Sequence, residues 1–135
     1  MLRRYIAGGF CAALVLIAGY ASLCAQDAQL AKAPAKIETV LRVDLAAEEG
    51  AALAGIESAM RVTVQPRTIT PDHTHTQRTS IVIMLEGTLT DVRGDAKKEY
   101  KLGDVFTVPE GTTHHAENYG TVPVVYIEIN TSPKK

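Results

Sequence analysis

Short apolar stretches, separated by turn residues, run through the chain from residue 37 onward. Val, Ile and Thr are frequent within these stretches, and Gly, Pro and Asp recur between them. Short stretches rich in β-branched residues predict strands, and turn residues between such stretches predict hairpins. The candidate strands are residues 38–43, 58–64, 79–85, 88–92, 98–100, 104–108 and 124–129.

The punctuation between these stretches supports a β fold. Residues 86–87 and 93–95 contain Gly in sequences typical of hairpin turns, and residues 109–111 (PEG) predict a tight corner. Residues 45–55 (LAAEEGAALAG) can form one helical turn, although two glycines disfavour a longer helix. Many short strands without a long helix predict an all-β sandwich or barrel, which does not by itself reveal a function.

The first 25 residues have a different character from the rest of the chain. Arg3 and Arg4 precede an uncharged run over residues 6–23, followed by small residues up to Ala25 and then a polar segment. A basic start, a short apolar core and small residues before a polar segment are typical of a secretory signal peptide. We therefore expect residues 1–25 to be cleaved and the protein to be exported, either to a periplasm or to the outside of the cell.

Two alternatives to a cleaved signal peptide remain open. A lipoprotein signal requires a small residue before the cysteine, whereas Leu23 precedes Cys24. An uncleaved membrane anchor is harder to separate, because the uncharged run approaches the length needed to span a bilayer, although Gly8, Gly9 and Gly19 dilute it.

Cleavage changes the composition of the mature chain. Both cysteines, Cys11 and Cys24, leave with the signal, so no thiol or disulfide remains. Loss of Arg3 and Arg4 reduces the 14 basic residues to 12, against 15 acidic ones, which gives a formal charge of −3. This balance indicates neither nucleic acid nor, after signal cleavage, a membrane as a partner. Residues 26–36 (QDAQLAKAPAK) then form a predicted flexible leader.

All four histidines lie in two short clusters, His73 with His75 and His114 with His115. Residues two apart on an extended strand face the same side, so the imidazoles of His73 and His75 can share a metal ion. This spacing alone is a weak signal, because exposed or hydrogen-bonded strand histidines are common.

The second cluster lies in a specific motif. Gly103, Pro109, Gly111, His114 and Asn118 stand in the order glycine, five residues, proline, one residue, glycine, two residues, histidine, three residues, asparagine. In this pattern the chain resembles the cupin superfamily, whose second motif it fits at every fixed position. The resemblance covers roughly residues 37–131, which we expect to form a single cupin domain.

The first cupin motif is matched with one exception. His73 and His75 stand at its two histidine positions and Gly87 at its glycine, but Ser80 occupies the position of its glutamate. The resemblance implies a cupin-type β-barrel, or double-stranded β-helix (jelly roll), of six to eight antiparallel strands. It also implies a homodimer formed through an edge strand such as residues 38–43.

The resemblance further implies that His73, His75 and His114 bind one divalent metal ion. Because a serine hydroxyl is a weak ligand, we expect three imidazoles and no carboxylate; iron, zinc, manganese, nickel and copper all suit such ligands. Gln77 shares the parity of His75 and contributes an oxygen if the strand continues to it. His115 should point the other way, and Asn118 is expected to hydrogen-bond in a turn.

An ion held by three neutral imidazoles keeps its full double positive charge, which attracts an anion inside a low-dielectric barrel. The resemblance implies that three-histidine sites also occur in cupin-related dioxygenases that act on thiols or diketones. Three functions stay open: a dioxygenase- or isomerase-like enzyme on a small anionic substrate, a non-catalytic module that binds a small ligand or metal, and a cupin whose site no longer binds metal. The sequence identifies no catalytic residue beyond the histidines.

Overall fold

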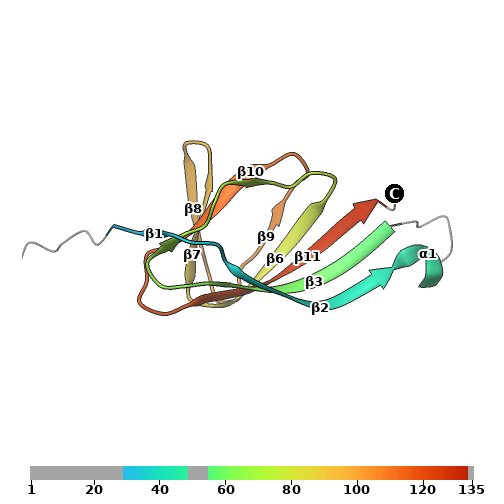
Figure 1. The fold of residues 1–135 in the computed structure, drawn as a ribbon, viewed down its shortest axis with the longest axis horizontal. Coiled ribbons are helices and arrows are strands. Elements are labelled where there is room, and N and C mark those ends of the chain that lie inside the picture. The colour runs from blue at the N-terminus through green and yellow to red at the C-terminus, as the bar shows by residue number, and fades with distance from the viewer. Residues whose placement is uncertain (1–28, 49–54, 134–135) are drawn as a thin grey trace, which may run out of the picture.

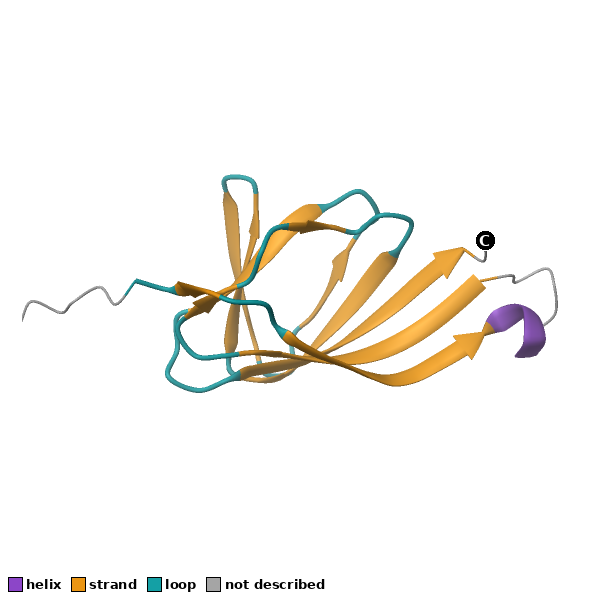
Figure 2. Ribbon diagram, viewed as in Figure 1, coloured by secondary structure: helices purple, strands orange, loops and turns teal. Residues whose placement is uncertain are grey.

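The computed structural model describes residues 29–48 and 55–133, and strands dominate both ranges (Figures 1 and 2). Three of the strands have two residues each, and the only helix in these ranges is α1 (Leu45–Glu48). The strands are β1 (Ala31–Lys32), β2 (Lys36–Asp44), β3 (Gly55–Val64), β4 (Thr68–Ile69), β5 (His73–Thr74), β6 (Thr79–Glu86), β7 (Thr88–Arg93), β8 (Ala96–Lys101), β9 (Val105–Val108), β10 (Thr113–Asn118) and β11 (Val124–Pro133).

The strands form two sheets that face each other. One has the order β1-β4-β10-β7-β8, with β5 paired to β10, and the other has the order β2-β3-β11-β6-β9. The pairs are antiparallel except for β1 with β4 among the described strands. This arrangement is the predicted all-β double-stranded β-helix, or jelly roll.

The core lies between the two sheets and follows the period-two alternation of the sequence. Val62 and Val64 of β3, Val82 and Met84 of β6, and Val124 of β11 are at most 2% exposed. Alternate residues of a strand face opposite sides, so Ser80 of β6 and Glu128 and Asn130 of β11 also face the interior, next to this apolar core. Those positions are polar, and they belong to the candidate site described below.

The predicted strands all correspond to observed ones, with ends that differ by a few residues. The sequence prediction missed β1, β4, β5 and β10, so the expected six to eight strands are too few for the described part of the chain. Three of these have two residues and carry no measurable periodicity. The fourth, β10, reads THHAEN, and its polar sequence hides the alternation because polar side chains occupy its buried positions.

The predicted turns occur where expected. Gly87, Gly94 and Gly111 have positive φ angles of 75°, 57° and 80°, a conformation that glycine adopts without steric cost. At Gly87 a side chain is excluded for a second reason, because an added Cβ would lie 2.9 Å from the carbonyl oxygen of Pro123. The single helical turn predicted within residues 45–55 is α1.

The segment predicted as a flexible leader, residues 26–36, is partly paired. Ala31 and Lys32 form β1, which runs parallel to Thr68 and Ile69 of β4. The predicted signal peptide lies outside the described residues. Within the described ranges, the structure has no helix with the length and hydropathy needed to cross a membrane.

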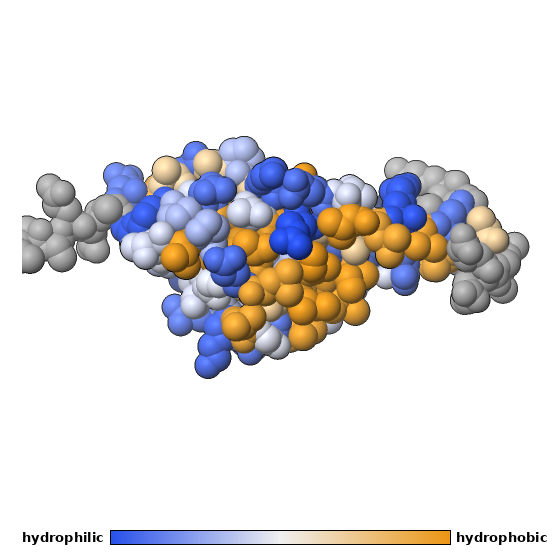
Figure 3. Space-filling model, turned by 90° about the horizontal axis from the view of Figure 1, so that it is seen from below, coloured by the Kyte–Doolittle hydropathy of each residue, from blue (hydrophilic) through white to orange (hydrophobic). Residues whose placement is uncertain are grey.

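Hydrophobic side chains also gather on the outside of the five-stranded sheet (Figure 3). Leu41 of the edge strand β2 is 58% exposed, and Ile81 of β6 and Val105 of β9 are exposed as well. An antiparallel sheet usually presents a polar face to water. The outer face of this sheet is therefore more apolar than the water-facing side of an antiparallel sheet usually is.

Candidate metal centre

Backbone pairing brings the two histidine clusters together. His73 of β5 lies directly opposite His114 of β10 in the antiparallel register. The backbone of His75 then bonds to the corner before β10: its N–H donates to the Thr112 carbonyl (3.0 Å), and the Gly111 N–H donates to its carbonyl (2.9 Å). The PEG corner thus holds His75 beside His114.

The three imidazoles converge on one point. One ligand nitrogen from each of His73, His75 and His114 lies within 4.8 Å of the other two. The ring centroids are 4.5 Å apart for His73 and His114, 4.9 Å for His75 and His114, and 5.4 Å for His73 and His75. His75 is fully buried, His114 is 8% exposed and His73 is exposed. The predicted metal ligands therefore form one cluster that is open on the side of His73.

Each imidazole is oriented through its Nδ1 atom. The partners of these Nδ1 atoms are the Pro71 carbonyl for His73 (3.3 Å), the Ser80 hydroxyl for His75 (2.9 Å) and the Asp91 carboxylate for His114 (2.5 Å). A ligand histidine in a metalloprotein commonly bonds through one ring nitrogen to such a partner, which fixes the ring and leaves the other nitrogen for the metal. The Nε2 atoms are thus left to face the centre of the cluster.

The spacing of these Nε2 atoms suits one metal ion. The Nε2 atoms of His75 and His114 are 3.0 Å apart. Two nitrogens that each lie ~2.1 Å from the same ion, at right angles, would be separated by ~3.0 Å. In metal-free protein the same distance allows one Nε2–H to donate a hydrogen bond to the other Nε2. The residues present therefore fit a divalent ion, which binds Nε2 when the proton of that ring is on Nδ1.

Burial favours the neutral, metal-binding form of His73 and His75. Burial lowers the pKa of His75 to about 3, with a further contribution from the positive charge of Arg78. Burial likewise lowers the pKa of His73. Because a metal ion competes with protons for the same nitrogen, imidazoles that stay neutral at neutral pH are ready to act as ligands.

Ser80, at the position of the cupin glutamate, contacts a ligand histidine and two further polar groups. It is fully buried, and its Oγ lies 2.9 Å from His75 Nδ1, 3.0 Å from a Glu128 carboxylate oxygen and 2.5 Å from the Asn130 side-chain oxygen. When His75 donates its Nδ1 proton to Ser80, the serine hydroxyl can donate its own proton to Glu128. A carboxylate is thereby linked to His75 through one hydroxyl.

Sequence reasoning missed Glu128 and Asn130, which lie on β11 outside both cupin motifs. Their signal is positional: residues 124, 126, 128 and 130 face the interior in the alternating pattern of β11, and the last two are polar and buried. An inward glutamate that is only 7% exposed requires a specific polar partner. Ser80 is that partner. It lies opposite Asn130 in the pairing of β6 with β11, which brings its hydroxyl within hydrogen-bond distance of Glu128.

Asp91 of β7 was also missed, although a buried aspartate within an apolar strand is a similar signal. It is 3% exposed and contacts both His114 and Arg93, whose Nε donates to it at 2.7 Å. Burial alone would raise the pKa of Asp91, but the hydrogen bonds from His114 and Arg93 outweigh this effect and lower it. A charged Asp91 holds the His114 ring with its Nδ1 proton on the outer side.

The remaining polar residues near the motifs face away from the cluster. The Nδ1 of His115 lies 2.7 Å from Asp72, and its Nε2 lies 3.3 Å from Glu117, on the opposite side of β10. Gln77 was expected to reach the site only if the strand from His73 continued. It does not, because β5 ends at Thr74 and Gln77 lies in a turn with a positive φ of 55°.

Asn118 closes the second motif as a structural residue, as predicted. It is 1% exposed, its amide donates to the carbonyls of Val64 (3.1 Å) and Val122 (2.9 Å), and its side-chain oxygen accepts from the Gly120 N–H (2.9 Å). The asparagine thus fixes the connection from β10 to β11 and does not contact the histidines.

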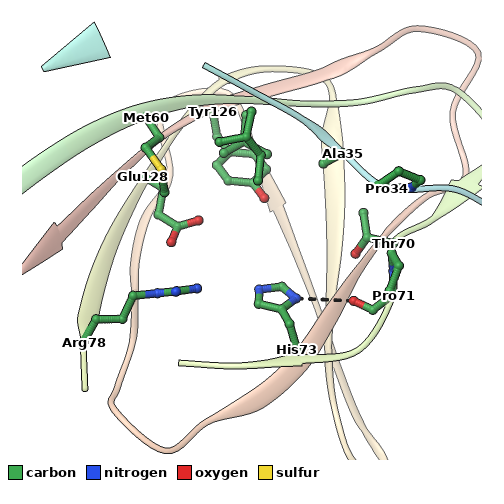
Figure 4. A pocket seen from close by; sticks show the side chains of 11 residues that line it. Pro34, Ala35, Met60, Thr70, Pro71, His73, Arg78, Tyr126 and Glu128 are labelled. Carbon is green, nitrogen blue, oxygen red and sulfur yellow. Dashed lines mark hydrogen bonds between the residues drawn. The ribbon is translucent and has the colours of Figure 1, made fainter. Parts of the chain in front are cut away.

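A cavity of about 320 Å³ adjoins the exposed side of the cluster at His73 (Figure 4). One wall is apolar and is formed by Pro34, Ala35, Ile37, Met60 and Val62. The polar residues that line the cavity include Thr70, Arg78, Tyr126 and Glu128. Cavities of this kind, apolar with a few convergent polar groups, are typical of sites for small molecules.

Comparison with known proteins places these features in a family. The family described as Cupin domain matches residues 60–130, which lie within the predicted domain 37–131. Germin-like protein subfamily 2 member 1 from Arabidopsis thaliana is 37% identical over 75 residues, covering 52% of this chain and 34% of that protein. A putative germin-like protein 2-1 from Oryza sativa subsp. japonica is 37% identical over 100 residues, covering 69% of this chain and 46% of that protein. The chain thus spans less than half the length of these relatives.

Solved structures agree with the fold. An uncharacterized conserved protein with a double-stranded beta-helix domain from Klebsiella pneumoniae superposes with a TM-score of 0.59 at 17% identity, covering 74% of this chain and 77% of that chain. At this identity the likeness concerns the fold alone. The family match over more than half of the chain, the two histidine motifs and the jelly roll together show that the protein belongs to the cupin superfamily.

Proposed function

We propose that this protein is an exported cupin that holds one divalent metal ion with His73, His75 and His114 and acts, as a dioxygenase- or isomerase-like enzyme, on a small anionic substrate. The observation that carries this proposal is the orientation of the three imidazoles. Each Nδ1 has a partner on the protein, so three Nε2 atoms are left to converge beside a cavity.

A divalent ion at this position would polarise a bound substrate oxygen or activate a water molecule. The chain itself supplies the other elements of a reaction site. His75 and His114 are buried, so bulk water reaches the cluster only from the side of His73. Arg78 adds positive charge next to the cluster, which favours a ligand that is an anion.

Glu128 supports an enzyme over a non-catalytic binding module. Its carboxylate lines the cavity and is 7% exposed. A carboxylate within reach of a bound molecule can accept a proton during turnover, which a module that only stores a ligand does not need. Oxygen uptake or product formation with candidate thiols, diketones and hydroxy acids would distinguish the two functions, because a binding module retains the ligand unchanged.

Metal analysis tests the first step of the proposal. Protein purified without a histidine tag and dialysed against a weak chelator should retain close to one equivalent of a single divalent metal. Protein with no bound metal, and with no measurable affinity for zinc, manganese, iron, nickel or copper, would contradict the proposal and favour a cupin whose site has decayed.

Export rests on the sequence of residues 1–25. A basic start and a short apolar core before Ala25 support cleavage by a signal peptidase. Intact-mass measurement of protein from the extracytoplasmic fraction should give the mass of a chain that begins near Gln26. A mass that includes residues 1–25 would contradict cleavage and favour the anchor.

A homodimer through β2 is the second untested element of the proposal. β2 lies at the edge of the five-stranded sheet and exposes Ile37, Val40 and Leu41. A second copy of the chain can pair with this edge about a two-fold axis, so the same residues would be covered in both copies.

A further inference from the structure

Arg78 places a guanidinium whose Nε has no hydrogen-bond partner in the cavity beside the histidines. It precedes β6, after the turn that contains Gln77, and it lines the cavity together with His73 and Glu128. Its Nε is buried and has no hydrogen-bond partner among the described residues. In Figure 4 the guanidinium extends into the space between Glu128 and His73.

An arginine in this state is unusual. Buried polar groups in proteins are almost always hydrogen-bonded, because a buried N–H without a partner forgoes its contacts with water. The nearest opportunity within the chain would be an ion pair with Glu128. The ion pairs of the described residues do not include this pair, and the hydrogen bond that Glu128 accepts comes from Ser80.

The missing partner of Arg78 should therefore come from a ligand. A guanidinium presents its N–H groups in a planar fork that matches a carboxylate with two parallel hydrogen bonds. The cavity has room for a small molecule, at about 320 Å³. Ala35, Met60 and Val62 give part of its lining an apolar surface, which gives no partner for a second charged group.

We propose that Arg78 binds the carboxylate of a small monocarboxylic acid whose apolar part lies against Ala35, Met60 and Val62. This inference rests on the proposed function and makes it more specific, because it assigns the anionic group of the substrate to Arg78. The carboxylate of such an acid then lies next to His73 and Glu128, because the Arg78 guanidinium extends between them (Figure 4). Arg78 acts as a specificity-determining residue of the site.

Binding of hexanoate to zinc-loaded protein tests this assignment. Hexanamide has the same apolar part without the charge, so wild-type protein should bind hexanoate at least tenfold more tightly than hexanamide. Arg78→Gln removes the fork, and it should weaken hexanoate binding about 10- to 100-fold while leaving hexanamide binding within twofold. Arg78→Lys keeps the charge without the planar fork and should fall between the two.

A matched control is Arg61→Gln, which removes an exposed arginine of β3 that does not line the cavity. It should bind hexanoate as wild type does. Zinc affinity is measured for every variant in the same titration series, so that the two proposals are separated. Retained zinc binding with equal hexanoate affinity in wild type and Arg78→Gln would overturn the assignment of Arg78 and leave the metal site intact.

Two other results are also decisive. Wild-type protein that binds zinc but prefers hexanamide over hexanoate would contradict a carboxylate ligand. Wild-type protein that binds no zinc would contradict the proposed function, and the inference that rests on it would fall with it.

Discussion

The hydroxyl of Ser80 lies 2.9 Å from Nδ1 of His75, on the side of the imidazole that faces away from the convergent Nε2 atoms. Where cupins carry a glutamate, this protein thus has a residue that supports a histidine. The same hydroxyl contacts Glu128 at 3.0 Å, so a carboxylate is present near the site but acts on His75 through Ser80.

Removal of this hydroxyl should weaken metal binding without removing a ligand. In Ser80→Ala the Nδ1 of His75 loses its partner, and loss of such an orienting hydrogen bond typically lowers metal affinity about 10- to 100-fold. Thr79→Ala changes an exposed neighbour on β6 and should bind zinc as wild type does. Competition with a zinc-binding dye measures both. Equal affinities for Ser80→Ala and wild type would mean that the contact does not orient His75.

The adjacent histidines of β10 provide a paired test of the ligand assignment. His114→Ala should remove most bound metal, because two imidazoles are too few for a stable site. His115→Ala removes a neighbouring imidazole that contacts Asp72 and Glu117, and it should retain close to one equivalent. Metal content by elemental analysis compares the two variants. Full metal content in His114→Ala, or its loss in His115→Ala, would show that the wrong histidine has been assigned.

The strands that carry the metal site were the hardest to predict from sequence. β6 and β11 are rich in Val and Ile on both faces, and both were expected. β5 has two residues, and β10 buries His114, Glu117 and Asn118, so neither has an apolar face to detect. The ligands were found through motif spacing and not through periodicity.

The residues around the ligands could not be predicted from the motifs at all. Asp91 and Glu128 are far from His75 and His114 in sequence, and only sheet pairing brings them near. Asp91 lies opposite Ala116 in the pairing of β7 with β10, and Glu128 lies opposite Val82 in the pairing of β11 with β6. The sequence shows only that each of these acidic residues lies within a predicted strand and needs a polar partner if it is buried. Which residue is that partner follows only when the strand register is known.

The metal-free protein should lose stability in mild acid. The pKa of His75 is about 3 in the folded protein and 6.5 in an unfolded chain, so between these values the unfolded chain binds a proton that the folded protein does not. The free energy of unfolding is therefore highest above pH 6.5 and falls as the pH decreases toward 3, by about 2 kcal/mol between pH 7 and pH 5.

Urea denaturation of metal-free wild type and His75→Asn at both pH values measures this effect. The variant lacks the titrating imidazole, so its stability should change less over the same interval. Parallel changes in the two proteins would assign the acid sensitivity to other groups.

The edge strand β2 offers a test of the proposed dimer. Leu41→Lys places a charge on an exposed apolar position, and charged side chains on an edge strand discourage pairing with another chain. We expect wild type to have the mass of a dimer in light scattering and Leu41→Lys to shift toward a monomer. Thr39→Lys introduces a charge two positions away on the same strand. It reports whether a charge anywhere on β2 is sufficient to disrupt the dimer. A monomeric wild type would exclude this dimer.

Replacement of Ser80 by glutamate should convert the site into the mixed site of other cupins. In Ser80→Glu the new carboxylate is confined near Glu128, and two buried like charges disfavour each other until a cation binds between them. Metal affinity should therefore exceed that of wild type. The carboxylate also offsets part of the charge of the ion, so azide should bind the metal-loaded variant more weakly.

Two further variants separate the effect of repulsion between the two carboxylates from the effect of the new charge on azide binding. Ser80→Glu combined with Glu128→Gln relieves the repulsion, so the metal-free protein should regain stability while azide binding stays weak. Thr79→Glu adds the same charge at an exposed position of β6 and should leave azide affinity within twofold of wild type. Zinc titration followed by azide titration measures all four proteins. Unchanged azide affinity in Ser80→Glu would mean that a side chain at position 80 does not reach the ion. The serine at this position would then not be the reason that the bound ion keeps its full charge.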